Sequence, residues 1–228
     1  RELVARGVDG RKIHVVLNGV DLSRYEPRGR DPGLAQELDL HGTFVAGYIG
    51  THGMAHALPK VVEAADLLKE RQDIVFFFAG AGAERAKVEQ TVANKRLTNV
   101  RLIPRQPKER MAALWSLCDV AIVPLKDSQV FTTVIPSKIF ESMGMGVPLL
   151  MSIPEGEATS IVRNTGSGVC VQPEDPGALA DAVVRLADDR EELARLGRRA
   201  REAAGRYSRD ALADKMLRIL KDVAGIGA

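Results

Sequence analysis

Short apolar runs alternate with stretches of helical periodicity along most of the chain. Continuous apolar runs of strand length are typical of parallel strands that are covered on both faces of a sheet. These runs predict strands at residues 12–17, 43–49, 73–79, 99–103, 119–124, 147–151 and 169–171.

Between the runs, apolar residues recur three, four and seven positions apart, which is the spacing of a helix lying on a core. The stretch from Leu58 to Leu68 shows this pattern clearly. Helices are predicted at 31–40, 57–68, 83–96, 107–117, 136–146, in a segment ending at 164, and over nearly all of 175–223. Because strand and helix alternate repeatedly, the predicted fold class is α/β, a Rossmann-like doubly wound parallel sheet with right-handed crossovers.

The composition fits a globular α/β protein and narrows its class. With 228 residues, 45% of them hydrophobic, the chain can fill a sizeable core. The net charge is +2 and aromatic residues make up 4%, so neither charge nor stacking surface indicates nucleic acid. No stretch approaches the roughly 18 apolar residues that cross a bilayer. Cys118 and Cys170 lack metal-ligand spacing, so we expect buried free thiols in a reducing compartment.

Residues 134–150 carry the clearest chemical signal. Pro136 fits the first turn of a helix, which we expect to end at the glycines of 144–146. The free N–H groups and positive dipole end of such a helix suit a phosphate, and Lys138 adds a full charge. Glu141, one turn later, is placed to accept hydrogen bonds from ribose hydroxyls. The alternative is an ordinary crossover helix on which Lys138 and Glu141 form a surface ion pair.

Further candidate segments follow the predicted strands. In open parallel sheets, ligands bind beyond the carboxyl ends of the strands, where the strand order reverses. We therefore expect residues 50–53, 80–82, 104–106 and 127–138 to meet at one rim. Glycines there would let backbone N–H groups approach a phosphate, although a plain turn is the alternative for each glycine pair. The candidate nucleotide-sugar-binding residues are Gly50, Thr51, His52, Gly53, Gly80, Arg105, Pro136, Ser137, Lys138 and Glu141.

Several other kinds of site lack support in the sequence. There is no G-x-G-x-x-G after the first strand and no P-loop motif, which argues against dinucleotide dehydrogenases and P-loop NTPases. His52 and His56 have helical spacing, but no carboxylate or cysteine nearby completes a metal site. The sequence contains no G-x-S-x-G motif, so a hydrolase of that class has no support. The arginines of 195–206 indicate a solvated helix face, with a membrane-surface or partner contact as the alternative.

These motifs together resemble the C-terminal, donor-binding half of retaining GT-B glycosyltransferases of family 4. The landmarks lie at residues 16–21, 47–50, 78–82 and 136–148, and residues 207–217 are similar to the family's terminal helix. The resemblance implies a single donor-binding domain over 1–228, with an interdomain strand and linker at 1–33, a Rossmann-like core at 34–206 and a terminal helix at 207–228. The first residues look like the tail of a helix, so we expect that an N-terminal acceptor domain precedes them.

The resemblance also implies roles for individual residues. In the family, the last carboxylate of an E-x7-E motif holds the nucleotide ribose, and Glu141 occupies that position. Thr133 stands at the first position, where the family's glutamate contacts the donor sugar. The family's Arg and Lys after the first strand are also missing, so Lys138 and the Ser137 N–H would bind the diphosphate. The implied catalytic residues are Lys138, Glu141 and Thr133.

The function implied by the resemblance is retaining transfer of a sugar from a UDP-sugar to an acceptor hydroxyl, without cofactor or metal. The Pro-Ser-Lys-x-Phe-Glu variant resembles a subgroup that uses UDP-activated N-acetylated deoxysugars in capsule or O-antigen assembly. The acceptor would bind the N-terminal domain, so we expect residues 1–228 alone to bind nucleotide weakly and to transfer no sugar. We expect a cytoplasmic location. A peripheral membrane contact of the full-length protein is left open.

Two other functions stay open. One is half of a UDP-sugar 2-epimerase, against which residues 18–21 and 136–138 argue. The other is a non-catalytic nucleotide-sugar-binding module, which Thr133 in place of a glutamate favours.

Overall fold

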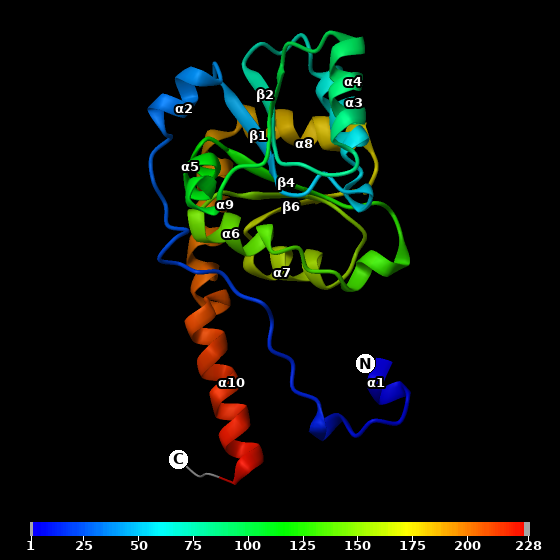
Figure 1. Ribbon diagram of the computed structural model, residues 1–228, viewed down its shortest axis with the longest axis vertical. Helices are drawn as coiled ribbons and strands as arrows, with labels where there is room; N and C mark the ends of the chain where they lie inside the picture. Colours follow the sequence, from blue (N-terminus) through cyan, green and yellow to red (C-terminus); the bar gives the residue numbers. More distant parts are fainter. Residues whose placement is uncertain (1, 226–228) are drawn as a thin grey trace.

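A parallel sheet of six strands forms the centre of the computed structural model, which describes residues 2–225 (Figure 1). The strand order is β3-β2-β1-β4-β5-β6, so the order reverses between β1 and β4. The strands are β1 (Phe44–Ile49), β2 (Ile74–Ala79), β3 (Val100–Ile103), β4 (Val120–Pro124), β5 (Leu149–Ser152) and β6 (Gly168–Val171). The predicted α/β class with a doubly wound parallel sheet is confirmed.

Helices cover both faces of the sheet and create two apolar cores. One core is closed by α2 (Pro32–Glu37), α5 (Met111–Ser116), α6 (Lys138–Met145) and α7 (Glu157–Thr165). The other is closed by α3 (Leu58–Leu67), α4 (Arg85–Lys95) and α8 (Pro176–Asp188), while α9 (Arg190–Ala204) contributes to both. Successive residues of β1, such as Val45 and Ala46, point into opposite cores, which explains why its apolar run is uninterrupted.

The start of a helix is encoded locally at several positions. Asp31 and Asp175 each accept a hydrogen bond from the backbone N–H three residues later, and a proline follows each of them. At the other end, α6 stops at Gly146, whose φ of 70° is a left-handed conformation that favours glycine. The end of α6 therefore agrees with the prediction.

The strand predicted at residues 12–17 is wrong. Gly10–Lys12 forms a 3₁₀ helix, residues 13–19 have no regular structure, and the first helix, α1, covers Glu2–Ala5. This segment runs beside α10 (Arg209–Ala224), where the Lys215 ammonium donates to the Val15 carbonyl at 2.8 Å (Figure 1). Just after this segment, Val20 forms an isolated parallel β-bridge with Ser208, outside the named strands. The remaining 3₁₀ helices are Met54–His56, Lys108–Arg110, Gln129–Thr133 and Gly205–Tyr207.

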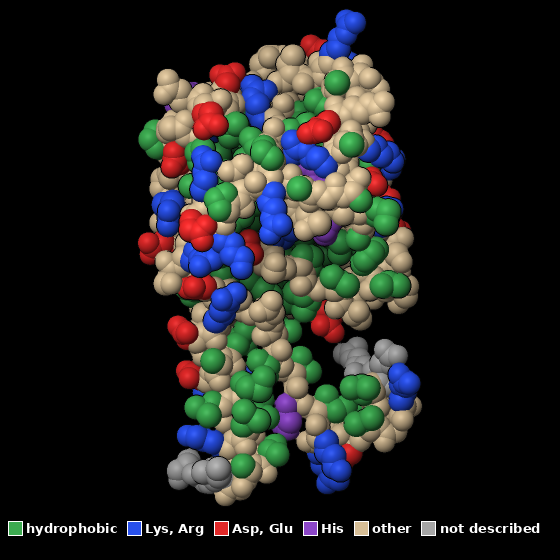
Figure 2. Space-filling model, in the orientation of Figure 1, with side chains coloured by type: hydrophobic (Ala, Val, Ile, Leu, Met, Phe, Trp, Pro, Cys, Tyr) green, Lys and Arg blue, Asp and Glu red, His purple; other side chains and the backbone are tan. Residues whose placement is uncertain are grey.

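Two terminal segments extend away from the body and carry exposed apolar side chains (Figure 2). These residues are Leu3, Val4, Val8 and Val15 on the N-terminal segment and Met216, Leu217, Leu220 and Val223 on α10. No helix within residues 2–225 combines the length and the apolar character needed to span a bilayer.

Both cysteines are free, as predicted. Cys118 is buried, whereas Cys170 is only half-buried, so the expectation of burial is right for Cys118 alone. The reason lies in position, because β6 is an edge strand whose residues are all partly accessible.

Candidate functional site

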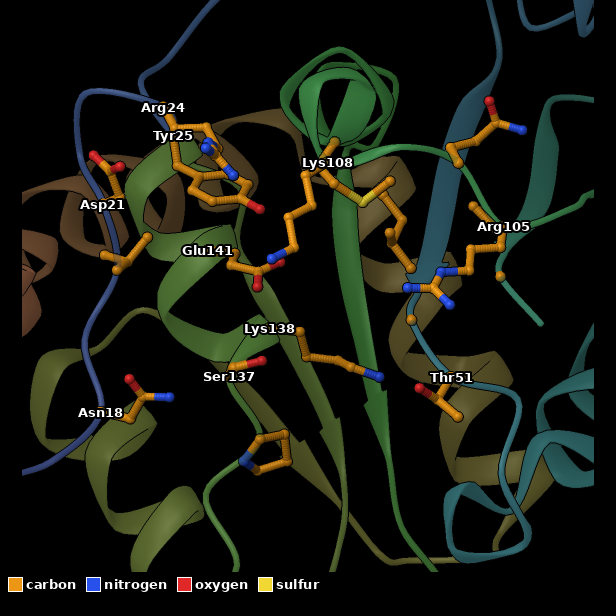
Figure 3. A pocket seen from close by; sticks show the side chains of 18 of the residues that line it. Asn18, Asp21, Arg24, Tyr25, Thr51, Arg105, Lys108, Ser137, Lys138 and Glu141 are labelled. Carbon is orange, nitrogen blue, oxygen red and sulfur yellow. The ribbon is translucent and has the colours of Figure 1, made fainter. Parts of the chain in front are cut away.

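A cavity of about 980 Å³ lies at the carboxyl ends of β1 and β2, beside the point between β1 and β4 where the sheet reverses its order (Figure 3). Its volume lies at the upper end of the range of small-molecule binding sites. The loops after β1, β2 and β3, the start of α6 and the N-terminal segment supply its walls. Eight of the predicted binding residues line it: Gly50, Thr51, Gly80, Arg105, Pro136, Ser137, Lys138 and Glu141.

Three other predicted residues do not line this cavity. His52 is fully buried behind the loop, where its backbone N–H donates to the Ala81 carbonyl at 2.9 Å. Gly53 lies beside the ring of His56. Thr133 is exposed at the end of the 3₁₀ helix Gln129–Thr133. The positions of these three residues do not support a direct contact with a ligand in the cavity.

Lys138 is the unusual residue of the site. It opens α6 and is 8% exposed, yet its ammonium has no hydrogen-bond partner among the described residues. The nitrogen lies 3.8 Å from the centre of the Tyr48 ring, a cation–π contact. Burial lowers the pKa of Lys138 to about 7, although the charge of Glu141 acts in the opposite direction. Within residues 2–225 Lys138 and Glu141 form no ion pair, so the alternative of a surface ion pair is wrong.

Gly50 allows the lysine to reach the loop after β1. A Cβ atom at this position would lie 3.0 Å from the Lys138 Nζ, and the φ of 147° is one that side chains rarely adopt. Gly80 packs directly against the backbone of Gly50. A Cβ atom at Gly80 would lie 1.8 Å from the Gly50 carbonyl oxygen. The lack of a Cβ at Gly50 and Gly80 therefore permits close packing of these loops against each other and against Lys138, and the approach of their N–H groups to a phosphate stays a prediction.

Glu141 lies one turn after Lys138 and lines the same cavity (Figure 3). The indole N–H of Trp115, on α5, donates to its Oε2 at 3.3 Å. Burial raises the pKa of Glu141, and the Trp115 hydrogen bond and the Lys138 charge oppose that rise. This carboxylate is an acceptor-only group with one oxygen already held in place.

Both histidines near the site are neutral at physiological pH. Burial is the main cause that lowers the pKa of His52 and of His56 to about 4, and the charge of Lys138 contributes to both. His56 lines the cavity, whereas the two ring nitrogens of His52 have no partner among the described residues. Within residues 2–225, no three His, Cys, Asp or Glu side chains are grouped so that they could hold a metal ion.

The sequence analysis did not identify the part of the cavity wall that the N-terminal segment and the start of α10 supply. Asn18, Asp21, Arg24 and Tyr25 come from the N-terminal segment, and Arg209 is the first residue of α10. The bridge between Val20 and Ser208 brings these distant segments together. The Asn18–Asp21 turn was the available signal, because it is one of the landmarks of the resemblance.

The cavity can hold an elongated anion with a polar, hydroxylated end. A buried cation and the N–H groups before α6 lie at one position, and a fixed carboxylate lies one helical turn away. Arg24, Arg105, Lys108 and Arg209 add positive charge around the opening, against the negative charge of Asp21 and Glu141.

Residues 35–203 match the family described as "Glycosyl transferases group 1". The D-inositol 3-phosphate glycosyltransferase of Nocardia farcinica is 30% identical over 211 residues, which cover 89% of this chain and 46% of that protein. The chain spans about half the length of the curated relatives it matches.

Solved structures share the fold. Anabaena Alr3699/HepE, in complex with UDP and glucose, superposes with a TM-score of 0.81 at 17% identity, covering 96% of this chain and 59% of that one. The C-terminal domain of a glycosyl transferase group 1 protein, LpcC of Francisella tularensis, gives a TM-score of 0.70 at 17% identity and covers 84% of this chain and 100% of that one. The expected Rossmann-like fold, as in one half of GT-B glycosyltransferases, is therefore confirmed.

Proposed function

Because the chain belongs to the glycosyl transferases group 1 family, we propose that it is the donor-binding half of a retaining GT-B glycosyltransferase of family 4. Its ligand is a nucleotide-diphosphate sugar, and a uridine nucleotide is the best candidate. The Anabaena protein with the same fold was solved with UDP, which supports this choice of base.

The observation that carries the proposal is the buried ammonium of Lys138, which has no hydrogen-bond partner within residues 2–225. A buried cation without a counter-ion is costly for a folded protein, and an anionic ligand would supply the missing partner. The diphosphate would lie between Lys138, the Ser137 N–H and the loop at Gly50, all of which line one cavity. Glu141, one turn along α6, would then accept hydrogen bonds from the ribose hydroxyls.

This placement explains how the donor half assists the reaction. When the bond between the anomeric carbon and the β-phosphate oxygen breaks, negative charge develops on that phosphate. Lys138 and fixed N–H groups interact more strongly with the developing charge than with the intact donor, so they lower the barrier. No metal or cofactor is needed for this stabilisation, and the sugar passes to an acceptor hydroxyl with retention at the anomeric carbon.

The rest of the enzyme is proposed to lie on a preceding N-terminal domain that binds the acceptor. The chain spans about half of its relatives, and the apolar side chains of α10 and the N-terminal segment would be buried by such a neighbour. The Pro136–Glu141 motif supports donors that carry N-acetylated deoxysugars, used in capsule or O-antigen synthesis. A cytoplasmic location, with a membrane contact through this proposed domain, belongs to the same proposal.

The test is a calorimetric titration of this chain with UDP, GDP and ADP. We expect UDP to bind best, and both Lys138→Ala and Glu141→Ala to weaken it by about tenfold or more, since each loses a charge-assisted contact. Unchanged affinity in both variants would falsify the site.

A non-catalytic nucleotide-sugar-binding module is the second candidate, because Thr133 lies outside the cavity and offers no carboxylate. Sugar transfer by the longer protein would exclude it. Release of an epimerised sugar from UDP-sugar alone would instead point to the epimerase.

A further inference from the structure

Trp115 is a fully buried aromatic residue whose only polar atom points toward the candidate ribose site. It lies on α5 and is 0% exposed. Its indole N–H donates to Glu141 Oε2 at 3.3 Å, and this is the sole side-chain hydrogen bond that reaches this carboxylate from residues 2–225. The contact joins two helices that follow different strands, so it is a feature of the tertiary structure.

The chemistry of this contact favours one arrangement of the carboxylate. Indole N–H is a donor only, so the oxygen that it holds must act as an acceptor. The contact also favours the ionised carboxylate, because it opposes the rise in the pKa of Glu141 that burial causes. Oε2 accepts this hydrogen bond, whereas Oε1 has no hydrogen-bond partner among the described residues and is free to accept from a ligand in the cavity that Glu141 lines.

We propose that Trp115 is a positioning residue that makes the site selective for ribonucleotides over 2′-deoxyribonucleotides, by holding Glu141 so that its free oxygen faces the ribose hydroxyls. The inference rests on the proposed function, because it requires that Glu141 binds the ribose. Trp115 itself does not line the cavity and acts only through Glu141. A misplaced carboxylate would lose the hydroxyl contact while leaving the diphosphate contacts at Lys138 intact.

The measurement is the affinity for UDP divided by the affinity for 2′-deoxy-UDP, determined by calorimetry on the chain. Wild type should prefer UDP by about tenfold, as expected for a hydrogen bond to a charged group. Trp115→Phe keeps an aromatic ring but removes the N–H, and it should reduce the preference to about threefold. Glu141→Ala should abolish the preference, and adding Trp115→Phe to Glu141→Ala should change nothing further.

Phe76→Leu is the matched control for lost packing. Phe76 is also a fully buried aromatic residue, but it lies in the core on the opposite face of the sheet. Its substitution should destabilise the fold and leave the UDP preference unchanged. This separates a positioning role of Trp115 from a general loss of stability.

The outcomes distinguish the two proposals. If Trp115→Phe keeps the wild-type preference for UDP over 2′-deoxy-UDP, the role of Trp115 is overturned while the proposed function stands. The same holds if Trp115→Phe changes this preference equally in the presence and absence of Glu141. If wild type binds UDP but Glu141→Ala keeps the preference for UDP, the ribose contact of Glu141 is wrong and the role of Trp115 is overturned with it. Failure of wild type to bind any uridine nucleotide overturns the proposed function as well.

Discussion

The ammonium of Lys138 lies 3.8 Å from the centre of the Tyr48 ring and has no hydrogen-bond partner among the described residues. The Tyr48 hydroxyl donates to the carbonyl of Thr51. The Tyr48 side chain therefore contacts both the Lys138 ammonium and the loop after β1. A ring face stabilises a buried cation by about 2 kcal/mol, less than a carboxylate with good geometry would. The charge of Lys138 is therefore left available for a ligand.

Lys138→Met should make the fold more stable and the site weaker. Methionine fills a similar volume without the cost of burying an unpaired charge, so the free energy of unfolding should rise by about 1–2 kcal/mol. UDP affinity should fall by about tenfold or more. Urea unfolding and calorimetry measure the two effects. Lys60→Met is the control, because Lys60 is only partly buried and forms a surface pair with Glu63, and it should change neither quantity appreciably. A destabilised Lys138→Met would contradict the prediction.

UDP binding should take up a proton at mildly alkaline pH. Burial lowers the pKa of Lys138 to about 7, and a bound diphosphate should raise it again by supplying negative charge. Affinity should therefore be steady below about pH 7 and decline as the pH rises above it. Calorimetry in buffers of different ionisation enthalpy counts the protons. If proton uptake persists in Lys138→Met, another group is responsible.

The same shift predicts how stability depends on pH. The folded-state pKa of Lys138, about 7, lies below the ordinary lysine value of 10.5, so the folded chain binds fewer protons than the unfolded chain between these limits. The contribution of Lys138 to stability should therefore rise with pH across this window. Urea midpoints of wild type and Lys138→Met should converge as the pH approaches 10. A gap that stays constant would argue against a depressed pKa.

Much of this site could be predicted because its main residues lie within one helix that follows one strand. The spacing of Lys138 and Glu141 placed them one turn apart, and the reversal point of the sheet placed their helix at a ligand site. Their spacing could not show that the two side chains form no ion pair within the described residues. Trp115, from a different helix, holds the carboxylate instead, and only the packing of α5 against α6 determines that.

The errors concern segments whose structure depends on distant partners. Residues 13–17 are mostly apolar, as in a strand, yet they pair with no strand of the sheet and instead lie beside α10, where Lys215 donates to the Val15 carbonyl. Arg24 and Arg209 join the cavity because of the bridge between Val20 and Ser208, which no local pattern reveals. Strand bounds in the core were accurate since each apolar run is buried over its whole length.

Gly50→Ala should weaken UDP binding because its Cβ would lie 3.0 Å from the Lys138 ammonium and displace it. The φ of 147° adds backbone strain of roughly 1–3 kcal/mol. Gly42→Ala is the matched control, since Gly42 also has a positive φ, of 71°, but faces open space. Both variants should lose stability in urea, and only Gly50→Ala should lose about tenfold in UDP affinity. Equal affinity in the two variants would argue against this loop as a phosphate contact.

Ser137→Pro tests the backbone donor before α6 without removing any side-chain charge. Ser137 has a φ of −58°, which proline adopts without strain, and its N–H has no acceptor among the described residues. The substitution should therefore leave stability nearly unchanged. UDP affinity should fall by about tenfold, because the diphosphate loses a charge-assisted hydrogen bond. Ser137→Ala retains the N–H and removes the hydroxyl, so it should bind UDP like wild type. If both variants bind UDP equally well, the start of α6 does not hold the diphosphate, and Lys138 alone must account for the anion site.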